Sequence, residues 1–358
     1  MHSVRLAGIR NQMSAKNLEV MLITNMQNIF YLSGFTGSTA AMVITADKSY
    51  ILVDPRYSIQ ARSECKDSEV RDYTRIAAVV AAASLIKELN AKSVGYEADN
   101  LVISSFGKLR RALGPGIKSR STTGMVEKIR RIKDPDELAL IRHACSIVDT
   151  TFEKIIQEIR PGMTENEIAL FIDTNMRKLG AEHEGFSTIA AAGPNSACPH
   201  HSPTDAMLKT GQFLKMDYGA QYMRYNSDIT RTIFFGKPTA KHREVYQTVL
   251  DAQMKAIESI APGKNCRDID AVAREYIASK GYGDNFGHGL GHSLGIDVHE
   301  EPRFSPTCDV VLEPGMVMTV EPGIYIEGWA GVRIEDDVLV TDTGCEVLTS
   351  ANKELICI

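Results

Sequence analysis

Hydrophobic and polar positions follow two different periods along the first third of the chain. Short apolar runs typical of β-strands alternate with segments whose apolar residues have helical spacing. We expect strands at residues 20–24, 41–45, 50–53, 93–97 and 117–121, and helices at residues 28–32, 56–64 and 77–89. This order predicts a small α/β domain with a mixed sheet. The segment has no phosphate-binding glycine loop and no nucleophile elbow, so we expect its role to be architectural.

The pattern changes near residue 125, where we place a boundary between domains at residues 1–125 and 126–358. After a basic stretch, Asp134 is suited to cap a helix, Pro135 fits its first turn and Glu137 completes a capping box. This helix is expected to run to about residue 159. A chain of 358 residues is long for one domain, which also favours two.

An internal repeat follows in the second domain. A Pro-Gly pair at residues 161–162 precedes a helical segment that begins with a capping box and ends at Gly180. The Pro-Gly pair at residues 262–263 precedes a similar segment that ends at Gly281, so the offset is 281 − 180 = 101 residues. Each half continues into a glycine-rich loop and then a strand pair with two acidic residues. Two such halves predict a pseudo-twofold core with a site between them.

Each predicted strand pair carries two carboxylates within apolar, β-prone sequence. Asp217 and Asp228 belong to the first half, and Glu321 and Glu335 belong to the second. A buried carboxylate without a partner is costly. An arginine would neutralise one of the four, but a set arranged two per half is better explained by bound cations. Oxygen ligands together with an imidazole suit two divalent metal ions such as Mn²⁺, Co²⁺ or Zn²⁺.

Imidazoles are concentrated in residues 286–300, which hold three of the nine histidines and four glycines. Glycine weakens helices and strands, so this density indicates a close approach of the backbone to a metal or substrate. Histidine is a common metal ligand and proton carrier near neutral pH. Taken alone, the run fits a surface loop equally well, and the four carboxylates favour the metal site.

Composition and charge exclude several classes of partner. The chain has 44% hydrophobic and 24% charged residues and a net charge of −5, as an ordinary globular protein does. It lacks a block rich in Lys and Arg, a membrane-length apolar run and a signal-peptide core, so we expect neither nucleic acid nor membrane as a partner. Seven widely spaced cysteines without CxxC spacing predict reduced thiols in a cytoplasmic protein.

With these motifs together, the chain from about residue 126 resembles the metallopeptidase family M24, which has the pita-bread fold and contains methionine aminopeptidase, aminopeptidase P, prolidase and creatinase. The five metal ligands of that family map onto Asp217, Asp228, His292, Glu321 and Glu335. The first third is similar to the N-terminal domain of the aminopeptidase P, prolidase and creatinase branch, in segments 31–37 and 54–57. The resemblance implies an α/β (α+β) fold, in which a creatinase-like mixed α/β domain precedes a pita-bread domain.

The resemblance also assigns catalytic roles. Two functional histidines outside the metal shell map onto His288 and His299. The histidine after the glycine loop of the first half maps onto His200, although His201 directly follows it and leaves two choices for the imidazole that faces the site. Glu321 would touch both metal and nucleophile, which makes it the expected proton shuttle to the leaving nitrogen.

Two arginines complete the expected site. Arg303 is placed to meet the C-terminal carboxylate of a substrate, and Arg333 is a second candidate for substrate binding, although bracing of its neighbouring carboxylates is the favoured role. The implied activity is hydrolysis of Xaa-Pro bonds in dipeptides or at peptide N-termini. We expect a cytoplasmic homodimer that acts on short proline-containing peptides with two divalent ions, Mn²⁺ before Co²⁺ or Zn²⁺.

Three alternatives stay open at this point. Methionine aminopeptidase shares the ligands but usually lacks the N-terminal domain. Creatinase has the two-domain plan but works without metal and lacks the full ligand set. Non-catalytic binding modules with this fold have generally lost ligands. The intact ligand set favours the Xaa-Pro peptidase, and the choice between dipeptidase and aminopeptidase is left open.

Overall fold

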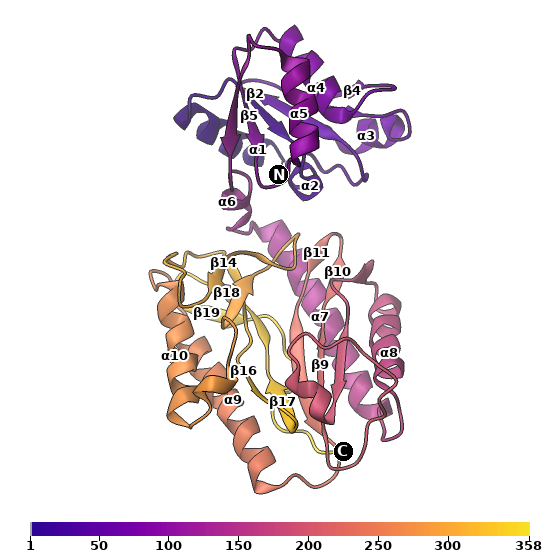
Figure 1. Ribbon diagram of the computed structural model, residues 1–358, viewed down its shortest axis with the longest axis vertical. Coiled ribbons are helices and arrows are strands. Elements are labelled where there is room, and N and C mark those ends of the chain that lie inside the picture. Colours follow the sequence, from indigo (N-terminus) through magenta and orange to yellow (C-terminus); the bar gives the residue numbers. More distant parts are fainter. Residues whose placement is uncertain (1) are drawn as a thin grey trace. The chain divides into compact units, whose positions relative to one another are not determined.

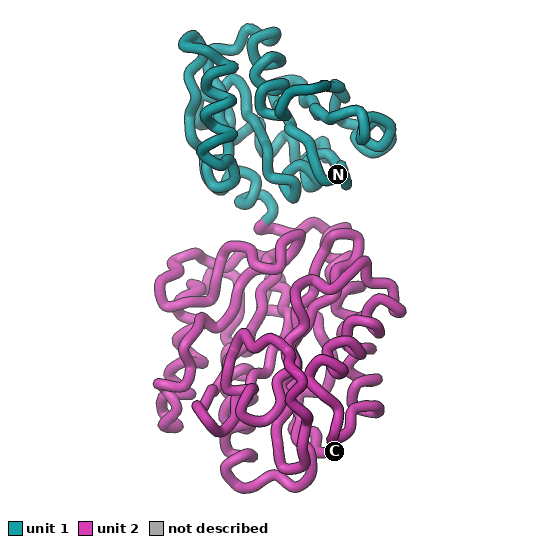
Figure 2. Tube along the Cα trace, turned by 45° about the vertical axis from the view of Figure 1, so that its right-hand side comes forward, with its two compact units in different colours: residues 1–130 teal, residues 131–358 magenta. Residues whose placement is uncertain are grey.

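A computed structural model describes residues 2–358 and divides them into two units, one up to residue 130 and one from residue 131 (Figure 2). The division falls just before helix α7 begins at Pro135, where Asp134 accepts a hydrogen bond from the backbone N–H of Glu137 in the expected capping box. Among the described residues, no helix is both long enough and apolar enough to cross a membrane.

The first unit is built on a six-stranded mixed sheet of order β4-β3-β2-β1-β5-β6, in which β1 is antiparallel to β2 and parallel to β5. The strands are Val20–Ile23 (β1), Ala41–Thr45 (β2), Ser49–Val53 (β3), Glu69–Asp72 (β4), Ser93–Glu97 (β5) and Lys118–Thr122 (β6). The helices are His2–Ala15 (α1), Met26–Ser33 (α2), Ser58–Glu64 (α3), Ala78–Glu88 (α4), Ile103–Leu113 (α5) and Glu127–Arg130 (α6). The prediction of an α/β domain with a mixed sheet is confirmed.

The second unit has two helix pairs with strands between them (Figure 1). The helices are Pro135–Glu158 (α7), Glu165–Lys178 (α8), Ala240–Ser259 (α9) and Cys266–Ser279 (α10), with short 3₁₀ turns at Gly193–Ala197 (η1) and Gly283–Asn285 (η2). One apolar core lies around α7 and α8 and a second around α9 and α10, and Phe213 and Phe234 of the first-half strands contribute to the second. This is the pita-bread arrangement that the sequence predicts.

The strands of this unit form four small sheets, of orders β11-β10-β7, β12-β9-β8, β14-β13-β15-β18-β19 and β16-β17. Those of the first half are His183–Glu184 (β7), Ile189–Ala192 (β8), Phe213–Tyr218 (β9), Ala220–Tyr222 (β10), Tyr225–Asn226 (β11) and Ile229–Phe234 (β12). Those of the second half are Gly291–Ser293 (β13), Glu300–Phe304 (β14), Val317–Val320 (β15), Gly323–Ile326 (β16), Ala330–Arg333 (β17), Asp336–Val340 (β18) and Cys345–Val347 (β19).

The predicted internal repeat is visible in the hydrogen bonds. Helices α8 and α10 begin at residues 165 and 266, and 266 − 165 = 101. Gly162 and Gly263 both have positive φ, of 96° and 84°, which glycine adopts without a Cβ penalty. Their N–H groups donate to equivalent carbonyls, Gly162 to Leu208 at 2.8 Å and Gly263 to Leu312 at 2.9 Å.

The strand runs that carry the carboxylates are shorter than the sequence predicts. Asp217 lies within β9, but Asp228, Glu321 and Glu335 each lie one residue outside a strand. At these breaks the backbone leaves the regular ladder. The N–H of Asp228 donates to the Asp337 side chain at 2.9 Å, and the N–H of Glu335 donates to the Thr230 carbonyl at 3.1 Å. The breaks therefore direct these side chains into the site between the halves.

Candidate metal centre and substrate pocket

A cavity of about 510 Å³ opens between the two halves of the second unit. All five predicted metal ligands and all five other predicted site residues line it, namely Asp217, Asp228, His292, Glu321, Glu335, His200, His288, His299, Arg303 and Arg333. The structure therefore brings together residues that lie as much as 135 positions apart, from His200 to Glu335.

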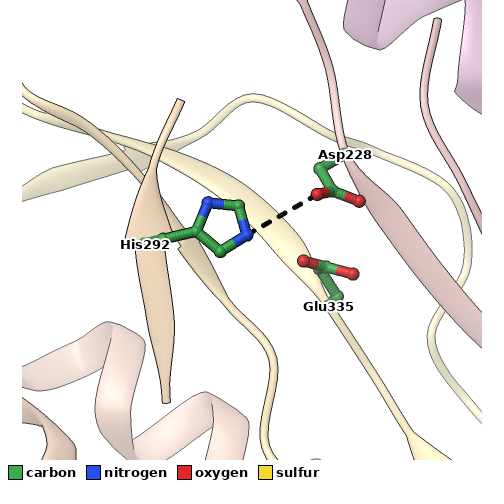
Figure 3. A group of neighbouring side chains, drawn as sticks. All are labelled: Asp228, His292 and Glu335. Atoms are coloured by element: carbon green, nitrogen blue, oxygen red, sulfur yellow. Dashed lines mark ion pairs between the residues drawn. The ribbon is translucent and has the colours of Figure 1, made fainter. Parts of the chain in front are cut away.

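Three of these side chains form a buried cluster, in which Asp228, His292 and Glu335 each direct a ligand atom to within 4.8 Å of the others (Figure 3). The Nδ1 atom of His292 lies 3.1 Å from the Ser293 carbonyl, which only accepts, so Nδ1 carries the proton. The lone pair of Nε2 then faces Asp228 at 3.8 Å and Glu321 at 3.5 Å. Acceptors that face one another in this way are stabilised by a bound cation or by a proton on one of the carboxyls.

Burial shapes the protonation of this cluster. It raises the pKa of Glu321 from 4.5 to about 7, with Arg333 acting in the opposite direction. Burial and the neighbouring carboxylates also raise the pKa values of Asp228 and Glu335 well above the ordinary range. Burial lowers the pKa of His292 to about 3, so its imidazole is neutral at physiological pH and free to act as a ligand.

An arginine neutralises one of the four carboxylates. The Arg333 guanidinium contacts Asp217, and its Nη1 atom donates to the Tyr325 hydroxyl at 2.8 Å while Nε donates to Thr230 Oγ1 at 3.0 Å. Arg231 pairs instead with Asp336 at 2.7 Å. Arg333 thus braces the carboxylates from within the protein, with its donors directed at protein groups.

The three other histidines lie on the walls of the cavity. Nδ1 of His288 donates to the Gly289 carbonyl at 2.8 Å, so Nε2 accepts from the Tyr325 hydroxyl at 3.0 Å, and burial lowers the pKa of His288 to about 4. The ring of His299 packs edge-on to that of His292, with centroids 4.4 Å apart. Both His200 and His201 line the cavity, but His200 is the more exposed, and Nε2 of His201 is held by the buried Glu165 carboxylate at 2.8 Å.

Comparison with known proteins places this arrangement in a family. A model described as metallopeptidase family M24 matches residues 139–342, and a model of the creatinase/prolidase N-terminal domain matches residues 5–132. The chain belongs to metallopeptidase family M24. The family and the two-part fold predicted from the sequence are confirmed, and so is the enzyme class of metallopeptidase.

Relatives of this M24 protein match over nearly their whole length. An Xaa-Pro dipeptidase structure from Bacillus anthracis is 38% identical, with a TM-score of 0.97 and 100% coverage of both chains. An X-Pro aminopeptidase structure from Thermotoga maritima is 37% identical, with a TM-score of 0.89 and coverage of 96% of this chain and 98% of that one. An Xaa-Pro dipeptidase from Pyrococcus horikoshii is 36% identical over 345 residues, 96% of each chain.

Membership of family M24 implies divalent metal ions, and the donors present fit them. Oxygens of four carboxylates and one neutral imidazole nitrogen are ligands that divalent transition metals accept. Within residues 2–358, the buried Oδ1 atoms of Asp217 and Asp228 have no hydrogen-bond partner, although such atoms are usually satisfied. Metal coordination by these five residues would satisfy both atoms.

Sequence reasoning missed the residues that orient the predicted ligands. Thr319 Oγ1 accepts from the His292 N–H at 3.0 Å and donates to Glu321 at 3.3 Å, and Thr230 Oγ1 donates to Glu335 at 2.6 Å. Tyr325 links His288 to Arg333. Such supporting contacts fix ligand orientation. Thr230 and Thr319 each lie two residues from a predicted ligand, which is a signal that the period of two along the predicted strands provides.

Proposed function

We propose that this protein is a metal-dependent Xaa-Pro dipeptidase whose centre is formed by Asp217, Asp228, His292, Glu321 and Glu335. The observation that carries this proposal is the convergence of these five residues at one cavity in a chain that matches Xaa-Pro dipeptidases along its length. The prediction of an Xaa-Pro peptidase is confirmed, since these relatives are 36–38% identical over nearly the full length.

Divalent ions held by the five residues would supply Lewis-acid polarisation of the scissile carbonyl and a nucleophile at neutral pH. The residues of the chain then supply the proton transfers. Glu321 lines the cavity and its Oε1 lies 3.5 Å from Nε2 of His292, so this carboxylate borders both the proposed metal ligands and the substrate space, where a proton shuttle to the leaving nitrogen has to lie. Mn²⁺ is the ion we propose, because the donor set is rich in oxygen and lacks thiolate.

The remaining polar residues bind and orient the substrate. Burial, with Arg303 and His200, lowers the pKa of His299, so its neutral ring has one N–H to donate to the developing oxyanion. His200 and His288 face the cavity and are suited to enclose a compact proline ring. An Xaa-Pro bond offers no amide hydrogen, so recognition has to come from such surfaces.

Arg303 supports a dipeptidase over an aminopeptidase. It lines the cavity, and its Nε atom lies 3.3 Å from Glu301 with both side chains more than half exposed. Exposed pairs of this kind are weak, so the guanidinium is available to a substrate carboxylate. The aminopeptidase is the second candidate, and the similarity to the Thermotoga maritima X-Pro aminopeptidase favours it.

A cytoplasmic location and a dimeric assembly are also part of the proposal. Within residues 2–358 all seven cysteines are free thiols, which supports a location in the cytoplasm. We also propose that the protein is a homodimer.

A direct assay tests the proposal. The purified chain is loaded with Mn²⁺ and given Ala-Pro, Ala-Pro-Ala and Ala-Ala at equal concentration, and the released amino acids are quantified. The dipeptidase should release proline from Ala-Pro much faster than alanine from Ala-Pro-Ala, and leave Ala-Ala intact. Equal rates on the first two substrates would favour the aminopeptidase. Cleavage of Ala-Ala alone would end the proline-specific assignment.

A further inference from the structure

The cavity wall that carries His200 is held by a buried carboxylate behind it. Glu165, the first residue of α8, is fully buried and accepts hydrogen bonds from four residues of the segment 192–204, which carries His200. Oε1 accepts from the Ala192 N–H at 2.7 Å and from Asn195 Nδ2 at 2.9 Å. Oε2 accepts from His201 Nε2 at 2.8 Å, and from the Thr204 N–H at 3.0 Å and hydroxyl at 2.6 Å.

The buried side chain of Lys215 holds the chain just before His200. Lys215 lies on β9 with no exposed surface, and its Nζ atom donates to the carbonyls of Ser196 at 3.1 Å, Cys198 at 2.7 Å and Pro199 at 3.3 Å. Within the described chain, no hydrogen bond holds the His200 imidazole itself. Its position therefore depends on the backbone that Lys215 and Glu165 fix on either side.

The internal repeat shows that the fold does not require a carboxylate at this position. Cys266 is the equivalent of Glu165 in the second half, because 266 − 165 = 101, and it is equally buried. Both backbones make the same contact, from the Glu165 N–H to Ala206 at 3.1 Å and from the Cys266 N–H to Val310 at 2.9 Å. Because α10 begins with an uncharged thiol at the equivalent position, a helix start here does not need a carboxylate. The carboxylate of Glu165 therefore has another function.

In the second half, a different pair of residues, Asp270 and Arg274, holds the loop that carries His288. Asp270, four residues further along α10, accepts from the Leu290 N–H at 3.0 Å and is paired with Arg274 at 2.7 Å. Arg274 donates to the His288 carbonyl at 2.7 Å. Each half thus fixes one histidine-bearing wall to its own helix, with a separate buried carboxylate.

We propose that Glu165 is a positioning residue for substrate recognition, which acts by holding the His200 wall of the cavity in place. This inference rests on the proposed function, because it assigns His200 to the binding of the Xaa-Pro substrate. Glu165→Gln keeps the shape of the side chain but places an NH₂ group against N–H and O–H donors. The wall then relaxes, and a displacement of about 1 Å costs up to roughly 100-fold in rate.

A double-mutant cycle on Ala-Pro hydrolysis tests the inference. E165Q should lower kcat/KM by about 10- to 100-fold in the wild-type background and by less than about 2-fold in the H200A background. In an H288A background, E165Q should still cause its full loss of kcat/KM. D270N should do the reverse, with little effect in the H288A background and its full effect in the H200A background. Equal losses from E165Q in the H200A and H288A backgrounds, an H200A variant with unchanged kcat/KM, or metal loss that matches the activity loss would overturn the proposal.

Hydrogen exchange gives a second readout that does not need activity. E165Q should raise amide exchange in residues 192–204 by at least about 10-fold and leave residues 286–290 unchanged, whereas D270N should do the opposite. Thr204→Val removes one donor with little change of shape, so it tests the same contact with less risk to folding and should raise exchange in the same segment. Unchanged exchange in both E165Q and T204V would contradict the tether. If the wild-type protein fails to cleave Ala-Pro while E165Q and T204V show these exchange effects, the proposed function is refuted and the contact between Glu165 and the His200 segment still stands.

Discussion

Nε2 of His292 lies 3.5 Å from Oε1 of Glu321, and neither atom carries a proton to share when the carboxylate is ionised. The arrangement is costly without a cation, and burial, with the neighbouring Asp217, raises the pKa of Glu321 from 4.5 to about 7. A carboxyl whose pKa is higher in the folded state contributes stability that is present below pH 4.5 and lost as pH rises through 7.

We therefore predict that Glu321→Gln stabilises the metal-free protein more and more as pH rises from 5 to 8, by up to about 3 kcal/mol. The free energy of unfolding is measured for the variant and the wild type by thermal or urea unfolding, and the difference between them is compared across pH. The difference is needed because buried His288 and His292 have lowered pKa values and change the stability of both proteins in the opposite direction below pH 6.5. A difference that stays constant or shrinks over this range would contradict the assigned ionisation. Added Mn²⁺ should favour the wild type instead.

Metal removal should abolish the activity. Arg333 is paired with Asp217, and within the described residues no lysine or arginine is paired with the other three carboxylates. Bound metal is therefore the cation that balances their negative charge. Dialysis against a chelator should leave an inactive chain, and Mn²⁺ or Co²⁺ should restore activity, with about two ions per chain at saturation. Metal analysis and proline release from Ala-Pro check this together. Full turnover in a metal-free preparation would move the protein to the creatinase alternative.

His299 and His292 should separate catalysis from metal binding, although their ring centroids lie only 4.4 Å apart. His299→Ala should lower kcat by roughly 10²–10³-fold, the usual cost of one oxyanion donor, while metal content stays unchanged. His292→Ala should lose metal and activity in parallel. Both variants are assayed for bound Mn²⁺ and for turnover of Ala-Pro. Metal loss in the His299 variant that matches its activity loss would show that His299 is a ligand.

Much of the second unit could be predicted because its signals are local. The capping boxes at Asp134 and Thr164 formed as expected, and the offset of 101 residues appears in both helix starts and both Pro-Gly turns. Buried carboxylates in apolar sequence are also a local signal, since their cost does not depend on where the partners lie. These features identify the candidate ligands before any contact is known.

The parts that sequence reasoning missed depend on contacts between distant residues. Glu165 looks like an ordinary first-turn acid of α8, and its hydrogen bonds reach residues 27–39 positions away. Helix α1 buries Leu6, Ile9 and Met13, whose spacing is helical, but three buried apolar residues in fourteen are a weak pattern. The strand breaks at Asp228, Glu321 and Glu335 had local signals that the prediction of continuous strands passed over, since Asn226-Ser227, Pro322-Gly323 and Asp336-Asp337 next to them are not β-prone.

Arg303 offers the sharpest test of the choice between dipeptidase and aminopeptidase. Its guanidinium lines the cavity and is held by Glu301 in an exposed pair, which contributes little to stability, so Arg303→Ala should change the melting temperature little. If it meets the free carboxylate of a dipeptide, the variant should raise KM for Ala-Pro by at least about 10-fold, the equivalent of one charge-assisted hydrogen bond. KM for Ala-Pro-Ala, whose carboxylate lies one residue further away, should change by less than about 3-fold. Glu301→Gln is the matched control, because it frees the guanidinium without removing it and should lower KM for Ala-Pro or leave it unchanged. Equal losses on both substrates in the Arg303 variant would remove this support for the dipeptidase and favour an aminopeptidase that is indifferent to the C-terminus of its substrate.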